Sequence, residues 1–95
     1  MYITNVTYPT PRGFKISFSD GRYVQVGTVL DDTLDEVKRL EHELVWAPVT
    51  RFDILPCGGF YLEYAVGNEL AYIKVQGSVD LTKEFYQFLR NTGRI

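Results

Sequence analysis

The feature that most constrains this chain is an alternation of apolar and polar residues on both sides of a glycine turn, which occurs twice. In the first stretch, residues 14–18 and 22–26 alternate in this way. Such a pattern is typical of strands with one buried face. A three-residue loop at 19–21, whose final glycine takes the left-handed conformation of a bulge, pairs Ile16 with Val24 and gathers the apolar side chains on one face.

The second alternating stretch predicts a hairpin from residues 60–66 and 69–75, joined by the two-residue turn Gly67-Asn68. This tight turn places Leu62 opposite Ile73 on the apolar face. The opposite face then carries a mixed set of side chains. They are Tyr61, Glu63, Leu70, Tyr72 and Lys74.

Residues 2–8 and 50–55 predict two further strands, and two segments predict helices. The first helix starts at 31–33, where Thr33 and Glu36 have the spacing of a capping box, and it ends near Val45 or Trp46. The second helix begins after Asp80 as N-cap and ends before Gly93. Its apolar stripe consists of Leu81, Phe85, Phe88 and Leu89.

These elements predict a single α+β domain spanning residues 1–95, in the order ββ(β)α-βββα. Because hairpins dominate, we expect a mainly antiparallel sheet of five to six strands with two helices packed on one face. Residues 1–47 and 48–95 also resemble one another as half-repeats. Two explanations stay open: an internal duplication, or the general likeness of any two amphipathic hairpin-plus-helix units.

Composition argues against several kinds of chemistry. The chain has one cysteine, Cys57, and one histidine, His42, which excludes an intramolecular disulfide and cysteine-rich or histidine-rich metal centres. A catalytic thiolate pair of Cys57 and His42 would require the single cysteine and the single histidine, which lie on different elements, to be close together by chance. The glycines lie between strands and do not form a phosphate-binding loop before a helix. We therefore expect no catalytic residues, no metal, no cofactor and no enzymatic activity.

The N-terminal residues lack the basic start and long apolar run of a signal peptide. No apolar stretch reaches the roughly 20 residues that a membrane span requires. We therefore expect a cytoplasmic protein without membrane contact.

Acidic residues are concentrated in the first predicted helix. Six of the twelve acids lie between residues 31 and 43 with only Lys38 and Arg39, which gives this segment a net charge of −4 against +2 for the rest. One interpretation is a solvated helix face, another is a carboxylate metal site, and the third is a patch for a basic partner. The candidate partner-binding residues are Asp31, Asp32, Asp35, Glu36 and Glu43.

Tyrosines supply the second candidate surface. Tyr23, Tyr61 and Tyr72, together with Lys74, are predicted to project from the sheet face opposite the core, near Lys15 and Glu63. Tyrosine is favoured in protein interfaces, and rows of aromatic side chains also stack single-stranded bases. A purely structural role, with the tyrosines packing on one another or under a helix, is the third interpretation.

Together these features favour a small, non-enzymatic protein-binding module, an adaptor or stoichiometric inhibitor that uses the acidic helix, the tyrosine-bearing face or both. Inhibitors of host machinery encoded by phages or mobile elements share this profile. The alternatives are binding of single-stranded nucleic acid through the sheet face, and a homodimeric structural protein.

Overall fold

The computed structural model describes residues 1–56, 58–77, 79–81, 87, 90 and 91. Within these residues the chain forms seven strands and one helix of 14 residues, in the order βββαββββ. Their bounds are β1 Ile3–Thr7, β2 Phe14–Phe18, β3 Tyr23–Val26, α1 Asp31–Leu44, β4 Val49–Ile54, β5 Phe60–Val66, β6 Glu69–Val75 and β7 Val79–Leu81.

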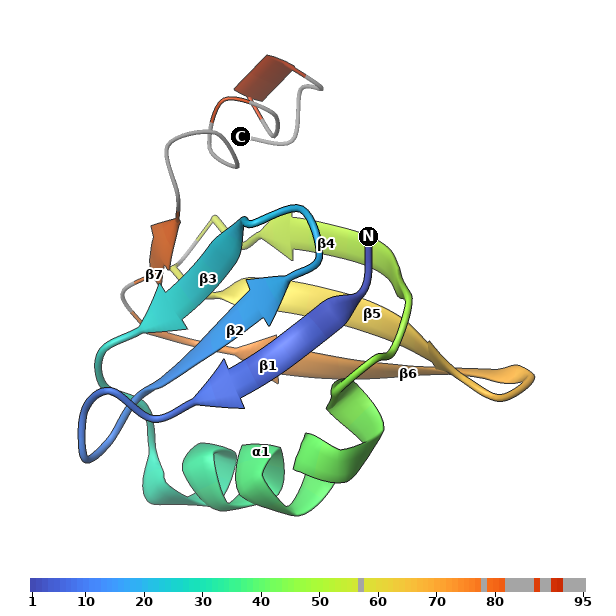
Figure 1. Ribbon diagram of the computed structural model, residues 1–95. Coiled ribbons are helices and arrows are strands. Elements are labelled where there is room, and N and C mark those ends of the chain that lie inside the picture. Colours follow the sequence, from blue (N-terminus) through green and yellow to red (C-terminus); the bar gives the residue numbers. More distant parts are fainter. Residues whose placement is uncertain (57, 78, 82–86, 88–89, 92–95) are drawn as a thin grey trace.

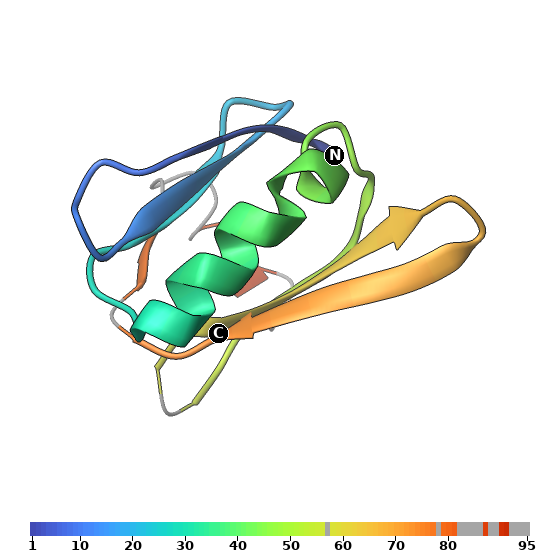
Figure 2. The same ribbon diagram turned by 90° about the horizontal axis from the view of Figure 1, so that it is seen from below.

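The strands form two antiparallel sheets with the orders β1-β2-β3-β7 and β4-β5-β6 (Figure 1). Helix α1 runs across the opening between the two sheets (Figure 2). The predicted α+β class and antiparallel pairing are confirmed. The prediction of one sheet of five to six strands is wrong, because the strands divide between two sheets whose apolar faces cover each other.

Both predicted hairpin registers are confirmed. Ile16 pairs with Val24, and Gly21 has a φ of 86°, as the bulged loop requires. Leu62 pairs with Ile73 across the tight turn. The boundary between the predicted half-repeats falls between the β1–β3 and β4–β6 meanders, and the duplication itself stays a prediction.

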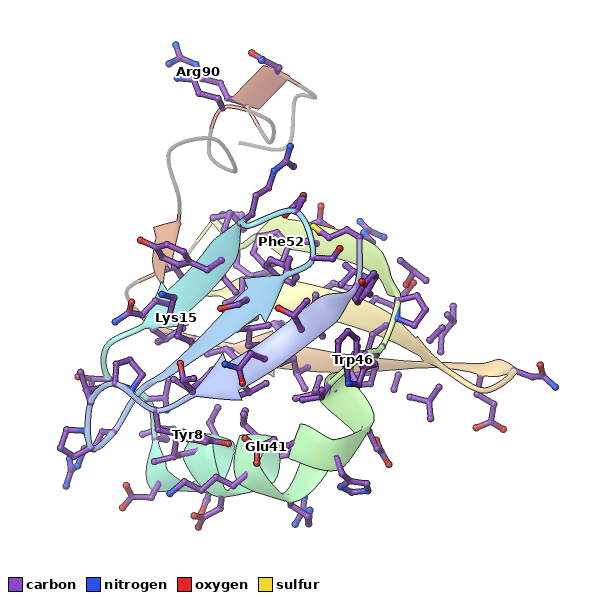
Figure 3. All side chains as sticks on the ribbon, in the orientation of Figure 1. Tyr8, Lys15, Glu41, Trp46, Phe52 and Arg90 are labelled. Carbon is purple, nitrogen blue, oxygen red and sulfur yellow. The ribbon has the colours of Figure 1, made fainter. Side chains whose placement is uncertain are left out.

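Phenylalanine side chains pack between the two sheets, and Figure 3 labels one of them, Phe52. Phe52 of β4 stacks on Phe60 of β5, with ring centroids 5.5 Å apart, and meets Phe18 of β2 edge-on at 6.3 Å. Phe14 of β2 meets Phe60 edge-on, also at 6.3 Å. All four side chains are at most 2% exposed, so the inter-sheet contact is dry and closely packed.

Helix α1 buries Leu34, Val37 and Leu44 in the same core cluster. It ends at Leu44 with Val45 as C-cap, where the sequence predicts its end. Its start differs from the prediction. The N-cap is Leu30, without a side-chain hydrogen bond, and Thr33 lies inside the helix, so the Thr33–Glu36 capping box is wrong.

The start of the helix is fixed by the residue before the cap. Val29 is only 6% exposed, and its N–H donates to the Arg12 carbonyl. The chain therefore leaves the core immediately before Leu30, which is 78% exposed. Asp31 and Asp32 then fall in the first turn, where the helix dipole favours negative charge.

Residues 79–81 differ from the predicted second helix. They form β7, in which Val79 pairs with Val26 of β3, so Asp80 is a strand residue and does not cap a helix. The strand supplies partners for β3, which would otherwise be an unpaired edge. Gln87, Arg90 and Asn91 are helical. The other positions of the predicted helix, including Phe85, Phe88, Leu89 and Gly93, lie outside the described residues.

The unfilled N-cap gives a stability prediction. Leu30→Ser places a hydroxyl where it can accept a hydrogen bond from the first turn of α1, and Leu30 is too exposed for its loss to cost much. We expect the free energy of unfolding, measured by urea denaturation, to rise by about 1 kcal/mol. Leu30→Ala lacks the oxygen and should give no gain. An equal gain in both variants would contradict the capping argument.

Candidate functional site

Residues alternate between more buried and more exposed positions along β5 and β6, which gives the β4-β5-β6 sheet an outer face. This face carries large aromatic and aliphatic side chains that are exposed. Leu70 and Tyr72 on β6 are 63% and 62% exposed, although both lie within a strand. We call this surface the tyrosine face. It consists of Arg51, Asp53, Tyr61, Glu63, Leu70, Tyr72 and Lys74.

The strand register orders these side chains into two rows across the sheet. Asp53, Tyr61 and Lys74 are cross-strand neighbours in one row. Arg51, Glu63 and Tyr72 form the other. In each row the central residue comes from β5, the middle strand, and the flanking residues come from the edge strands β4 and β6.

Contacts within the tyrosine face hold its side chains in place. The Tyr61 and Tyr72 rings stack with centroids 5.5 Å apart and planes 24° from parallel. The Tyr61 hydroxyl donates to Glu63 Oε2 at 3.1 Å, and the Thr50 hydroxyl donates to Glu63 Oε1 at 2.8 Å. Ordered rings of this kind lose little conformational entropy when a partner binds.

The electrostatics of the tyrosine face are balanced. Arg51 forms an ion pair with Asp53 and lies 5.9 Å from the Tyr61 ring centroid. Partial desolvation and the hydrogen bond to Glu63 raise the pKa of Tyr61, so its hydroxyl remains a donor at neutral pH. Two basic and two acidic side chains share the surface, which has no net charge to attract a polyanion.

An open depression of about 400 Å³ lies at one end of the tyrosine face. Its lining residues are Arg51, Asp53, Leu55, Tyr61, Tyr72 and Lys74. Within the described part of the chain, the ion pairs involve Arg22 with Asp20 and Arg51 with Asp53, and neither includes Lys74. Lys74 therefore presents a cation beside two aromatic rings at an accessible position.

Tyr23 does not share this face. It lies on β3, where the Lys15 ammonium of β2 sits 4.2 Å from its ring centroid. Figure 3 shows Lys15 on the front sheet, whereas β4-β5-β6 forms the back one. The expectation that Tyr23 joins Tyr61 and Tyr72 is wrong because the sheets pack with their apolar faces together, which directs their outer faces apart.

The acidic residues of α1 point in several directions. Asp31, Asp32, Asp35 and Glu36 are exposed, whereas Glu43 is half-buried. Burial, with the charges of Glu43 and Glu36, raises the pKa of Tyr64 on β5. On the other flank of the helix, Glu41 lies beside Tyr8 (Figure 3). The described residues contain no group of three or more His, Cys, Asp or Glu side chains that could hold a metal ion.

Sequence reasoning missed one aromatic pair. Trp46 is 67% exposed and lies against Tyr2, with ring centroids 5.6 Å apart and ring planes tilted by 35°. It has a φ of 71°, a left-handed conformation that costs a non-glycine residue roughly 1–2 kcal/mol. Its N–H donates to the Ile3 carbonyl at 2.6 Å, which ties the end of α1 to β1. The helix end was predictable here, but no pattern indicates that a tryptophan occupies the left-handed position.

No structural finding tests a pairing of the two unique residues, Cys57 and His42. His42 is exposed on α1, and Cys57 lies outside the described residues.

Comparisons of the chain with protein-family models, curated proteins and solved structures found no match. Among the described residues, no helix has the length and apolar character needed to span a membrane.

The raised pKa of Tyr64 gives a pH prediction. The folded state favours the neutral phenol, so its contribution to stability is intact below the unfolded pKa of about 10 and is lost as the pH rises above it. As the pH rises above about 10, the free energy of unfolding from urea denaturation should therefore fall less for Tyr64→Phe than for wild type. Tyr2→Phe, which removes a phenol hydroxyl at a 41% exposed position, serves as the control for the buried Tyr64. Identical alkaline losses in wild type and Tyr64→Phe would contradict the assignment.

Proposed function

We propose that this protein is a small, non-enzymatic protein-binding module, an adaptor or stoichiometric inhibitor that binds through the tyrosine face. The observation that carries the proposal is the stacked Tyr61–Tyr72 pair beside exposed Leu70 on a sheet face with balanced charge. Tyrosine adds large, stiff contact area with a polar tip, and large apolar side chains gathered on one exposed face mark interaction sites.

The acidic residues of α1 support an auxiliary role in this proposal. Asp31, Asp32, Asp35 and Glu36 are exposed and can accelerate encounter with a partner whose rim is basic. We place the protein in the cytoplasm, and inhibitors of host machinery encoded by phages or mobile elements are the class whose profile it fits.

Protein is a better partner than single-stranded nucleic acid for this surface. The stacked rings and Lys74 could hold a base and a phosphate. However, Arg51 is already paired with Asp53, and Glu63 adds a second negative charge. Binding of nucleic acid draws most of its affinity from phosphate neutralisation, which a surface of zero net charge does not provide.

Photocrosslinking tests the proposal. With p-benzoylphenylalanine at position 72, irradiation in extract of the native host should give protein adducts several-fold more abundant than with the same group at Asn5. Asn5 is exposed on the outer side of β1 and serves as the matched control. Adducts with another protein or with a second copy both count as binding.

Two results would contradict the proposal. One is equal adduct yields from positions 72 and 5. The other is tight binding of a fluorescent oligothymidylate that weakens steeply with salt and is lost in the double variant Tyr61→Ala, Lys74→Ala, because this would assign the tyrosine face to nucleic acid.

A further inference from the structure

We propose that the tyrosine face binds a second copy of this chain, related by a two-fold axis that runs parallel to β5 above the centre of the sheet. This inference rests on the proposed function, since it names the partner of the same surface. Figure 2 shows that neither α1 nor the other sheet lies over the outer side of β5 and β6. The exposure of Leu70 and Tyr72 agrees with an uncovered face.

The order of the three strands determines how two copies of this sheet can face each other. Because β5 is central, a two-fold axis along it exchanges the two edge strands, so that β4 of one copy lies opposite β6 of the other. Residues in one cross-strand row stay at the same height along the axis. Each row therefore meets the same row of the second copy in reversed order.

The first row is self-complementary in charge under this operation. Asp53, Tyr61 and Lys74 face, in that order, Lys74, Tyr61 and Asp53 of the second copy. Each lysine, which has no ion-pair partner among the described residues, then meets a carboxylate, and this contact forms twice. The two Tyr61 rings meet on the axis, where aromatic pairs add to the interface.

The second row adds contacts of another kind. Arg51 of each copy lies opposite Tyr72 of the other, an arrangement that suits a cation over an aromatic ring. The two Glu63 carboxylates approach one another near the axis, which is unfavourable. Both oxygens of each carboxylate already accept hydrogen bonds, from Thr50 and from Tyr61, which holds them within their own sheet.

The size of the face sets the strength of the dimer. Three strands about 4.8 Å apart, with six or seven residues at about 3.4 Å each, cover a small area compared with standard interfaces. Aligned packing of two such sheets at about 10 Å leaves room for the tyrosine side chains. We therefore expect a reversible dimer whose population depends on concentration.

Charge exchange combined with sedimentation equilibrium tests the proposal. Wild type should pass from monomer to dimer between micromolar and millimolar concentrations. Asp53→Lys places lysine opposite lysine and Lys74→Asp places carboxylate opposite carboxylate, so each variant alone should dimerise at least about tenfold more weakly. An equimolar mixture of the two should dimerise again, because both contacts between positions 53 and 74 of unlike copies then join opposite charges.

The control is Lys15→Asp, which makes the same charge reversal as Lys74→Asp but on the other sheet. This variant should dimerise as wild type does. Circular dichroism of each variant shows that loss of dimer is not loss of fold. Wild type that stays monomeric at millimolar concentration would overturn the proposal, as would a mixture that dimerises no better than its components. If wild type does not form the dimer but position 72 still crosslinks to another protein, the proposed function stands and only the dimer is ruled out. If position 72 also gives no crosslinks, the proposed function and the dimer both fail.

Discussion

The rest of the structure depends on the contact between Phe52 and the phenylalanines on either side of it. Phe52 of β4 meets Phe18 of the first sheet and stacks on Phe60 of its own, with all three rings buried. A sheet with one apolar face must bury that face against another layer of structure. Each sheet here covers the other, and α1 closes the opening between them with Leu34, Val37 and Leu44.

The same constraint determines which surfaces are free to bind. Because successive side chains of a strand point to opposite faces, burial of Phe60, Leu62 and Tyr64 directs Tyr61 and Glu63 outward. The packing of the two sheets also sends Tyr23 and the Tyr61–Tyr72 pair to opposite sides of the molecule. The tyrosine face is thus a direct consequence of how the core is built, and its charge pattern follows from the register of β4, β5 and β6.

Sequence patterns predicted local features well where alternation and turn residues act together. They gave both hairpin registers, the end of α1 and five members of the tyrosine face. They did not show that the strands divide between two sheets, since alternation reveals which face of a strand is buried but not what covers it. β7 has only three residues, too few for periodicity to distinguish from a helix start, and Asp80 resembles an N-cap.

Two further features depend on tertiary contacts that no local pattern contains. Leu30 becomes the N-cap because Val29 is anchored to the Arg12 carbonyl, and this position outweighs the intrinsic preference for Thr33. Trp46 takes a left-handed conformation because its N–H is held by Ile3 of β1. Both are cases in which packing decides against local propensity.

Amide hydrogen exchange on the central strands β2 and β5 tests the dependence of both sheets on one shared core most directly. If neither sheet survives without the other, the most protected amides of β2 and of β5 exchange only by global unfolding, and their exchange free energies agree with each other and with the value from urea denaturation. A difference of more than about 1 kcal/mol between the two strands would show that one sheet opens while the other persists, and would contradict the account.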